Sequence, residues 1–167
     1  MKTCAFTGHR PRRLPFGFNE NDIRCKLLKD NIRSNIISLI ENKEVVNFIS
    51  GMALGIDMYA AEIVLELKEY YPFITLEAAI PCENQSAKWI SSSVKRYNDI
   101  LKKTDKITIL QKEYTPTCMQ KRNKYMVDNC DYLIAVYNGK PGGTRNTLNY
   151  AERVGKEVIL INPTTMY

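Results

Sequence analysis

The sequence has few of the residues that cross-link small proteins or bind metals. It contains one histidine and five cysteines, and no two of the cysteines form a C-x-x-C pair. Unpaired thiols in odd number are typical of a reduced protein whose cysteines are mostly buried. No cluster of side chains has the spacing of metal ligands. We therefore predict a cytoplasmic chain with no structural metal and no resident cofactor.

Long apolar runs are missing too. No stretch approaches the roughly 18–20 apolar residues that a membrane span needs, and the apolar N-terminal residues lead at once into polar Gly8-His9-Arg10, unlike a signal peptide. The 167 residues are 44% hydrophobic and 25% charged, which is an ordinary globular composition. Without repeats, low-complexity tracts or linkers, residues 1–167 are predicted to form one domain with its own core.

Three common enzyme signatures are absent. The chain has no GxxxxGK[ST] phosphate loop, no GxGxxG after its first predicted strand and no GxSxG nucleophile elbow. This largely excludes P-loop nucleotidases, dinucleotide-dependent dehydrogenases and α/β-hydrolases. The net charge of +6 favours an anionic partner. Nucleic acid and a phosphorylated small molecule both meet that description.

What the chain does have is an alternation of short apolar runs and helical patterns. This alternation predicts an α/β fold: a single Rossmann-like domain with a mostly parallel sheet of about six strands and helices on both faces. The strands are expected at Thr3–Thr7, Val45–Ser50, Phe73–Ile80, Lys106–Leu110, Tyr132–Tyr137 and Glu157–Ile161. Their apolar cores suit strands that are covered on both faces.

Five helices are expected between the strands, at about 22–42, 55–69, 85–103, after Thr117, and at about 144–154. Asn21 or Asp22 is a candidate N-cap for the first, Thr117 for the fourth, and Gly155 suits the end of the fifth. Helical spacing predicts inward-facing residues in the first four helices: Ile23, Leu27, Ile32, Ile36 and Ile40; Ile56, Ala60, Ile63, Val64 and Leu67; Ile90, Val94, Tyr97 and Leu101; and Met119, Met126 and Cys130.

Two glycine-containing loops are expected at the ligand edge of the sheet. In open α/β sheets, ligands bind beyond the carboxyl ends of the strands. The segments Gly51–Gly55 and Gly139–Gly143 each follow a strand there and open a helix, where free N–H groups attract phosphate. The loops are predicted to form a phosphate and ribose cradle together with the basic loop after the first strand. The alternative is that the glycines only make tight turns.

The loop after the first strand carries the ionisable candidates. His9 could bond a ribose or phosphate, relay a proton, or fix its own loop. Arg10 and Arg13 are candidates for bidentate phosphate contacts, whereas Arg12 is expected on the surface. Elsewhere, Asp57 could cap the second helix or accept from a ribose hydroxyl. Trp89, the one tryptophan, could stack on a base or belong to the core.

The order of these loops resembles the SLOG superfamily, and within it the YpsA-like branch. The resemblance covers nearly the whole chain and is carried by Thr7–Pro11, Ser50–Asp57, Pro81 with Gln85 and Trp89, Arg122–Met126, and Gly142-Gly143-Thr144 with Thr147. The ligand-binding residues that it implies, together with the loop analysis, are Gly8, His9, Arg10, Arg13, Gly51, Ala53, Gly55, Asp57, Pro81, Gln85, Trp89, Arg122, Asn123, Gly142, Gly143, Thr144 and Thr147. Gln85 and Trp89 are expected nearer the base.

The chain resembles two groups of relatives whose functions differ. The segment Ser50–Asp57 is similar to a motif of the DNA-processing protein DprA, which binds single-stranded DNA. The segment Met119–Leu148 resembles the Lonely-guy phosphoribohydrolases, in which Arg122 matches a catalytic arginine and Pro141-Gly142-Gly143 a phosphate-binding element. Those relatives are dimers, so the resemblance implies a homodimer, with Met119, Tyr125 and Met126 as candidate contacts.

The chain departs from the phosphoribohydrolases at one point. Their paired glutamates are replaced by Asn149 and Tyr150, which bring no negative charge to an oxocarbenium-like transition state. The resemblance therefore implies binding of a nucleotide-like ligand, derived from NAD or ADP-ribose, without turnover, as a sensor or a trap. Two alternatives stay open: a nucleotide N-glycosidic hydrolase that uses another carboxylate such as Asp57 or Glu83, and a single-stranded DNA binder.

Overall fold

The computed structural model describes residues 1–165 and contains one six-stranded sheet with helices on both of its faces. The strands are β1 (Lys2–Gly8), β2 (Val45–Ser50), β3 (Thr75–Ile80), β4 (Lys106–Ile109), β5 (Tyr132–Val136) and β6 (Glu157–Ile161). The helices are η1, a 3-10 turn (Pro11–Arg13), α1 (Ile23–Lys43), α2 (Ile56–Leu67), α3 (Ser91–Lys103), α4 (Cys118–Asp128) and α5 (Gly143–Arg153). The predicted fold class is confirmed.

The strand order is β4-β3-β2-β1-β5-β6, and every neighbouring pair is parallel. From β1 the chain first builds outward through β2, β3 and β4, and then returns to the other side of β1 to add β5 and β6. The direction of winding therefore reverses between β1 and β5. At such a switch point the loops leave the sheet in opposite directions and open a crevice beyond the carboxyl ends of the strands.

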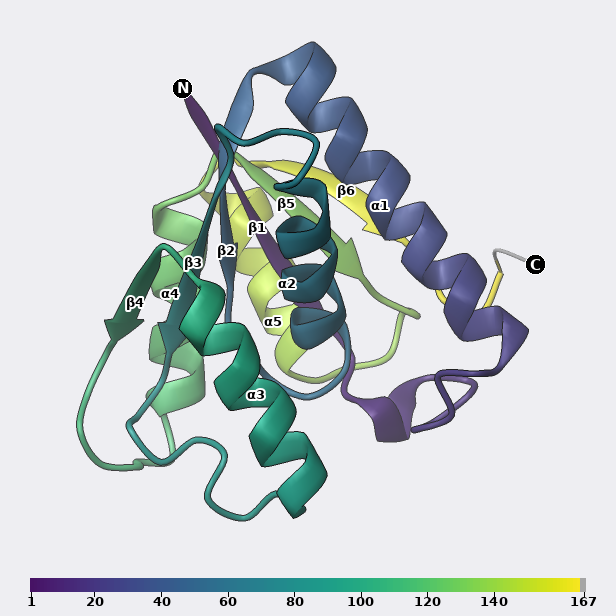
Figure 1. Ribbon diagram of the computed structural model, residues 1–167. Helices are drawn as coiled ribbons and strands as arrows, with labels where there is room; N and C mark the ends of the chain where they lie inside the picture. Colours follow the sequence, from purple (N-terminus) through teal and green to yellow (C-terminus); the bar gives the residue numbers. More distant parts are fainter. Residues whose placement is uncertain (166–167) are drawn as a thin grey trace.

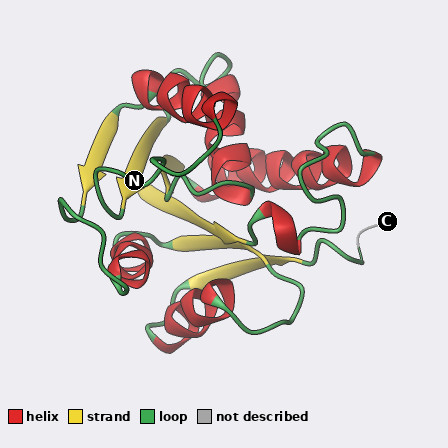
Figure 2. Ribbon diagram, turned by 90° about the horizontal axis from the view of Figure 1, so that it is seen from below, coloured by secondary structure: helices red, strands yellow, loops and turns green. Residues whose placement is uncertain are grey.

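The helices form two layers, and the two faces of the sheet that they cover bury side chains of different size. Helices α1, α2 and α3 lie on one face of the sheet, and α4 and α5 lie on the other (Figures 1 and 2). Large side chains such as Phe6, Phe48 and Leu28 fill the first face. The second is lined by small ones such as Ala5 and Ala79. Among residues 1–165, no helix is long and apolar enough to span a bilayer.

Several local expectations are confirmed. Asp22 caps α1 by accepting from the N–H of Arg24 at 2.8 Å, and Gly155 follows the end of α5 with a φ of +79°. The predicted inward face of α2 is buried. All five cysteines are free and buried.

Other expectations are wrong. Ile23 and Leu27 are exposed, because Cys25 and Leu28 supply the buried face at the start of α1. The third helix begins at Ser91 rather than near 85, since residues 81–90 form turns, and Ile90 is 72% exposed. Thr117 takes the N-cap position of α4 but its side chain makes no capping hydrogen bond.

Two further corrections concern the sheet. The strand predicted from Phe73 begins at Thr75, and Phe73 is exposed. The edge strand β4 is not covered on both faces, since its residues Lys106, Ile107 and Ile109 are exposed. By contrast, all five residues of β5 are buried, as expected for a strand next to the centre of the sheet.

Candidate functional site

A cavity of about 200 Å³ lies at the switch point. Its wall combines the loop after β1, the start of α2, one face of α4 and the N-terminus of α5. The lining residues are Thr7, Gly8, His9, Arg10, Arg13, Ala53, Asp57, Met119, Arg122, Asn123, Gly143 and Thr144. Segments far apart in the sequence thus converge on one small space, where the parallel topology predicts a ligand.

Charge in this cavity is unbalanced. Arg10, Arg13 and Arg122 line it together with a single carboxylate, Asp57. Arg10 and Arg13 are solvent-exposed, while Arg122 is only 3% exposed and Asp57 8%. A concave surface with an excess of guanidinium groups concentrates anions and suits phosphate, which guanidinium binds through paired N–H donors.

Arg122 is held by uncharged partners. Its guanidinium donates to the carbonyl oxygen of Gly51, to Asn123 Oδ1 at 2.8 Å and to Gln85 Oε1 at 3.4 Å. Burial lowers the pKa of Arg122, and the nearby Asp57 carboxylate opposes that shift. Burial likewise raises the pKa of Asp57, against the attraction of Arg122. A buried cation with these partners is stabilised further when an anion enters the cavity.

His9 is 2% exposed and lines the same cavity. Its Nε2 accepts from the backbone N–H of Asn138 at 3.1 Å, so the neutral ring carries its proton on Nδ1. Within residues 1–165 that Nδ1 has no hydrogen-bond partner. Burial, followed by the positive charge of Arg13, lowers the pKa of His9. His9 therefore fixes a loop, as one of its predicted roles requires, and its Nδ1 is an unused N–H donor.

The N-terminus of α5 supplies further donors. Its first intrahelical hydrogen bond runs from the N–H of Asn146 to the carbonyl oxygen of Gly142, at 3.1 Å. The N–H groups of Gly143 and Thr144 precede it and are not used by the helix. Both residues line the cavity. These N–H groups and the helix dipole favour an anion there.

Arg13 joins the two loops that flank the switch point. Its Nη2 donates to the carbonyl oxygen of Pro141 at 2.7 Å. Gly142 makes room for this contact, because a Cβ at that position would lie 2.4 Å from Arg13 Nη1, and the φ of Gly142 is +148°. Arg13 is thus both a cavity residue and a bridge between the β1 and β5 loops.

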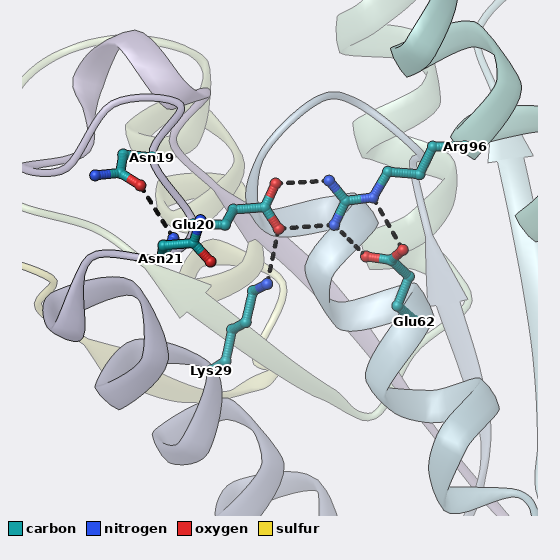
Figure 3. Close-up of polar contacts among 6 residues, drawn as sticks. All are labelled: Asn19, Glu20, Asn21, Lys29, Glu62 and Arg96. Carbon is teal, nitrogen blue, oxygen red and sulfur yellow. Dashed lines mark hydrogen bonds and ion pairs between the residues drawn. The ribbon is translucent and has the colours of Figure 1, made fainter.

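The chain that leaves Arg13 is anchored at its far end by ion pairs (Figure 3). Glu20 accepts two hydrogen bonds from Arg96 of α3, at 2.6 and 2.8 Å, and one from Lys29 of α1, at 2.7 Å. Arg96 also binds Glu62 of α2. These contacts lower the pKa of Glu20 to about 2, with the Arg96 hydrogen bonds as the largest cause. Residues 10–22 therefore form a strap whose Glu20 is fixed to α1 and α3.

The structure gathers most of the predicted residues but not all of them. Gly142 and Thr147 line an adjoining groove between α4 and α5, and the Thr147 hydroxyl donates to the carbonyl oxygen of Gly143 at 2.9 Å. Gly51 and Gln85 lie behind Arg122 as its hydrogen-bond partners. Gly55 abuts the carbonyl oxygen of His9.

Pro81 and Trp89 lie away from the cavity wall. Pro81 is buried at the end of β3, which is two strands from β1. Trp89 packs edge-on against Tyr97 with ring centroids 5.3 Å apart, and its side chain contacts the core. The core interpretation of Trp89 matches this packing. The expected position of Gln85 and Trp89 near a base does not.

Two lining residues were missed at the sequence level. Thr7 directly precedes Gly8 on β1, and Met119 precedes Arg122 by three residues on α4. Residues three apart share a helix face, so the spacing to Arg122 already pointed to Met119. Asp57 does not cap α2 from outside: it lies in the first turn and accepts from the N–H of Ala53 at 3.3 Å.

Comparison with known proteins agrees with this geometry. Residues 4–166 match the family model YpsA, described as the YspA SLOG family. The chain belongs to this SLOG family. It is 34% identical over 150 residues to the SPbeta prophage-derived protein YoqJ of Bacillus subtilis, covering 81% of this chain and 88% of that protein. It is 32% identical over 156 residues to the UPF0398 protein BH1768 of Halalkalibacterium halodurans, covering 92% and 82%.

Solved structures share the fold of this SLOG protein. DNA processing protein A (DprA) of Streptococcus pneumoniae superposes with a TM-score of 0.66 at 18% identity, over 99% of this chain and 52% of that one. DprA of Helicobacter pylori, whose structure describes a single-stranded DNA binding mode, gives 0.64 at 18%, over 95% and 64%. TM1055 gives 0.57 at 17%, over 95% and 72%. The chain spans about half the length of the pneumococcal protein.

Proposed function

We propose that this SLOG protein binds a nucleotide-like ligand, derived from NAD or ADP-ribose, with a phosphate in the cavity at the switch point. The observation that carries the proposal is the buried guanidinium of Arg122, which faces a cavity that two further arginines line. The free N–H groups at the start of α5 and the unpartnered Nδ1 of His9 support it, because each is a donor suited to phosphate or ribose oxygens.

Binding without turnover fits the carboxylates of the site. Asn149 is exposed on α5, and the hydroxyl of Tyr150 donates to Asp128 at 2.6 Å. Asp57, the cavity's carboxylate, is buried, accepts from the N–H of Ala53 and is attracted by Arg122, so its charge is already engaged by the protein. Glu83, the other candidate, is exposed after β3. The protein then acts as a sensor or as a trap that sequesters its ligand.

A thermal-shift panel tests this function. Purified protein is heated with AMP, ADP-ribose, cyclic ADP-ribose, NAD or a short single-stranded DNA, and every ligand that shifts the melting temperature is recovered and analysed. A ligand that binds only the folded state stabilises it by about 2.7 kcal/mol at one hundred times its Kd. We expect a shift with a nucleotide that is recovered intact. Released base would instead establish an N-glycosidic hydrolase.

Single-stranded DNA is the competing ligand, because the fold matches two DprA structures. The salt dependence of affinity separates the two, since each phosphate contact with DNA releases counterions and steepens the loss of affinity with salt. A shift with DNA alone, lost steeply between 50 and 200 mM salt, would overturn the small-ligand proposal. The homodimer expected from the sequence is tested on the same sample by light scattering. Met126 is not a contact in it, because Met126 is buried in the core under α4.

A further inference from the structure

The cavity at the switch point is too small for a whole nucleotide. Ligand pockets for drug-sized molecules usually measure about 300–1,000 Å³, and this one holds about 200 Å³. Its lining includes three arginines, an aspartate and the threonines of β1 and α5. Such a space suits a phosphate and a sugar. The aromatic base of a nucleotide bound there must therefore extend into an adjoining space.

A groove of about 590 Å³ between α4 and α5 adjoins the cavity. The two share Met119, Asn123 and Gly143 as lining residues, so they lie side by side. The groove offers both apolar surface and amide groups. Its remaining lining residues are Pro116, Gln120, Lys124, Gly142, Asn146, Thr147, Tyr150 and Arg153.

Tyr150 gives this groove a fixed aromatic wall. Its ring lies 5.2 Å from Lys124 Nζ and 5.2 Å from the Arg153 guanidinium carbon, and its hydroxyl donates to Asp128. These contacts come from both helices and set the orientation of the ring before any ligand arrives. With these cations over it, the ring is ordered in advance and adds apolar surface to the groove.

The other side of the cavity is closed to a base. Gln85 is engaged with Arg122, the carbonyl oxygen of Gly51 and the Tyr97 hydroxyl. Trp89 is packed against Tyr97. Both side chains have these partners in the layer behind Arg122, which favours a base site elsewhere.

We propose that the groove between α4 and α5 is the base subsite, taking the aromatic base of a nucleotide whose phosphate and ribose occupy the switch-point cavity. This inference rests on the proposed function and adds where the ligand lies. The amides of Asn123 and Asn146 are the groups that recognise the edge of the base, while Met119 and Pro116 supply apolar contacts to it.

The experiment compares a ligand that has the base with one that lacks it. Isothermal titration with AMP and with ribose 5-phosphate is carried out on the wild type, on Asn146→Trp, which places bulk in the groove, and on Asn149→Trp. Asn149 is exposed on the same helix and does not line the groove, so it is the matched control. We expect Asn146→Trp to weaken AMP at least tenfold and to leave ribose 5-phosphate within twofold of wild type. Asn149→Trp should change neither.

A photolabel gives an independent readout. Irradiation with 8-azido-AMP, followed by peptide mass spectrometry, should label segment 116–124 or 146–153. Label on segment 85–97, or equal AMP affinity in Asn146→Trp and wild type, would overturn the base subsite while leaving the phosphate cradle intact. Failure of the wild type to bind any nucleotide of the thermal-shift panel would instead refute the proposed function itself.

Discussion

The imidazole Nε2 of His9 accepts a hydrogen bond from the backbone N–H of Asn138, at 3.1 Å, and so joins the loop after β1 to the loop after β5. These loops flank the reversal in strand order and carry residues that line the cavity. The ring also keeps a buried Nδ1–H donor without a partner. The His9 side chain thus joins the two loops that shape the crevice, and it can also change its protonation state. Its contribution can therefore be measured as a function of pH.

The stability of the protein should fall as the pH drops below about 6.5. His9 has a pKa lowered from 6.5 in the folded state, so below that pH the unfolded chain binds more protons than the folded one. Stability from this residue is complete above pH 6.5 and is lost as the pH falls toward the folded-state pKa. The measurement is the melting temperature from pH 5 to 8 for wild type and His9→Gln. The wild-type curve should be steeper over this range, and parallel curves would contradict the assignment.

Gly143→Asp should abolish ligand binding without harming the fold. A Cβ at Gly143 meets no heavy atom within 4 Å, so the side chain fits. A carboxylate in the first turn of α5 is favourable by about 0.3–1 kcal/mol through the helix dipole, but it repels a phosphate at that position. We expect an equal or higher melting temperature and at least a tenfold loss of affinity for the nucleotide identified by the panel. Gly143→Asn, which has nearly the same shape and no charge, is the control.

Arg10→Ala should weaken the same ligand with little effect on stability. Arg10 is exposed at the rim of the cavity, where its best-defined contact is a long one of 4.0 Å to Met119 Sδ. Loss of a charge-assisted contact to phosphate corresponds to about 1.5–3 kcal/mol, or roughly 10–150-fold in Kd. Arg12→Ala is the matched control, since Arg12 is exposed on the same turn and does not line the cavity. Equal affinities in both variants would remove Arg10 from the cradle.

Gly8→Ala should destabilise the protein, unlike changes at Gly143. A Cβ on Gly8 would lie 2.5 Å from the Cβ of Ile56, at the start of α2, so β1 and α2 must move apart. Overpacking of this kind costs about 1–3 kcal/mol. Urea denaturation measures the difference, with Gly143→Ala as the control that has open space. A stability of Gly8→Ala within about 0.5 kcal/mol of wild type would mean that the contact relaxes freely.

Breaking the anchor of the strap should affect binding from a distance. In Glu20→Gln the ion pairs with Arg96 and Lys29 are lost, and residues 10–22 are no longer held against α1 and α3. We expect the ligand Kd to rise three- to tenfold. We also expect the wild type to lose stability between about pH 4.5 and pH 2, because the Glu20 pKa is lowered to about 2. The variant should lack that component, and a surface change such as Asp99→Asn should leave ligand affinity unaltered.

The sequence predicted the sheet well because its strands are short apolar runs between glycine and polar turns, as in β5, and the glycine loops marked the ligand edge. It predicted the buried faces of helices less well, because these depend on how each helix packs against the sheet. Ile23 and Leu27 match a helical period as well as Cys25 and Leu28 do, and only the position of the sheet selects the second pair. The strand order brings the β1 and β5 loops together. It depends on contacts between distant segments and not on local sequence patterns.

Within the site, the sequence pointed to arginines and glycines that the structure places at or beside the cavity, but not to the layer in which each residue lies. Nothing in the spacing of Gln85 shows that it hydrogen-bonds Arg122, and nothing in the spacing of Trp89 shows that it packs against Tyr97. Met52 is a similar case: it is buried with a left-handed φ of +59° in the loop before α2, where a glycine would be the expected residue. Such backbone geometry depends on the surrounding structure holding it in place.

The parallel pairing of β1 with β5 also has a kinetic consequence. Cys4 lies beside Tyr132 and Gly8 beside Val136, so the central strand takes its second partner from a segment synthesised far later. Contacts between segments this far apart in sequence form slowly, because the entropic cost of closing a long loop comes before the contacts stabilise the chain. During translation the N-terminal strand can pair with β2 early on, whereas the crevice is completed only once β5 has emerged. The crevice is thus among the last features that the nascent chain completes, and binding at this site would report on completed folding.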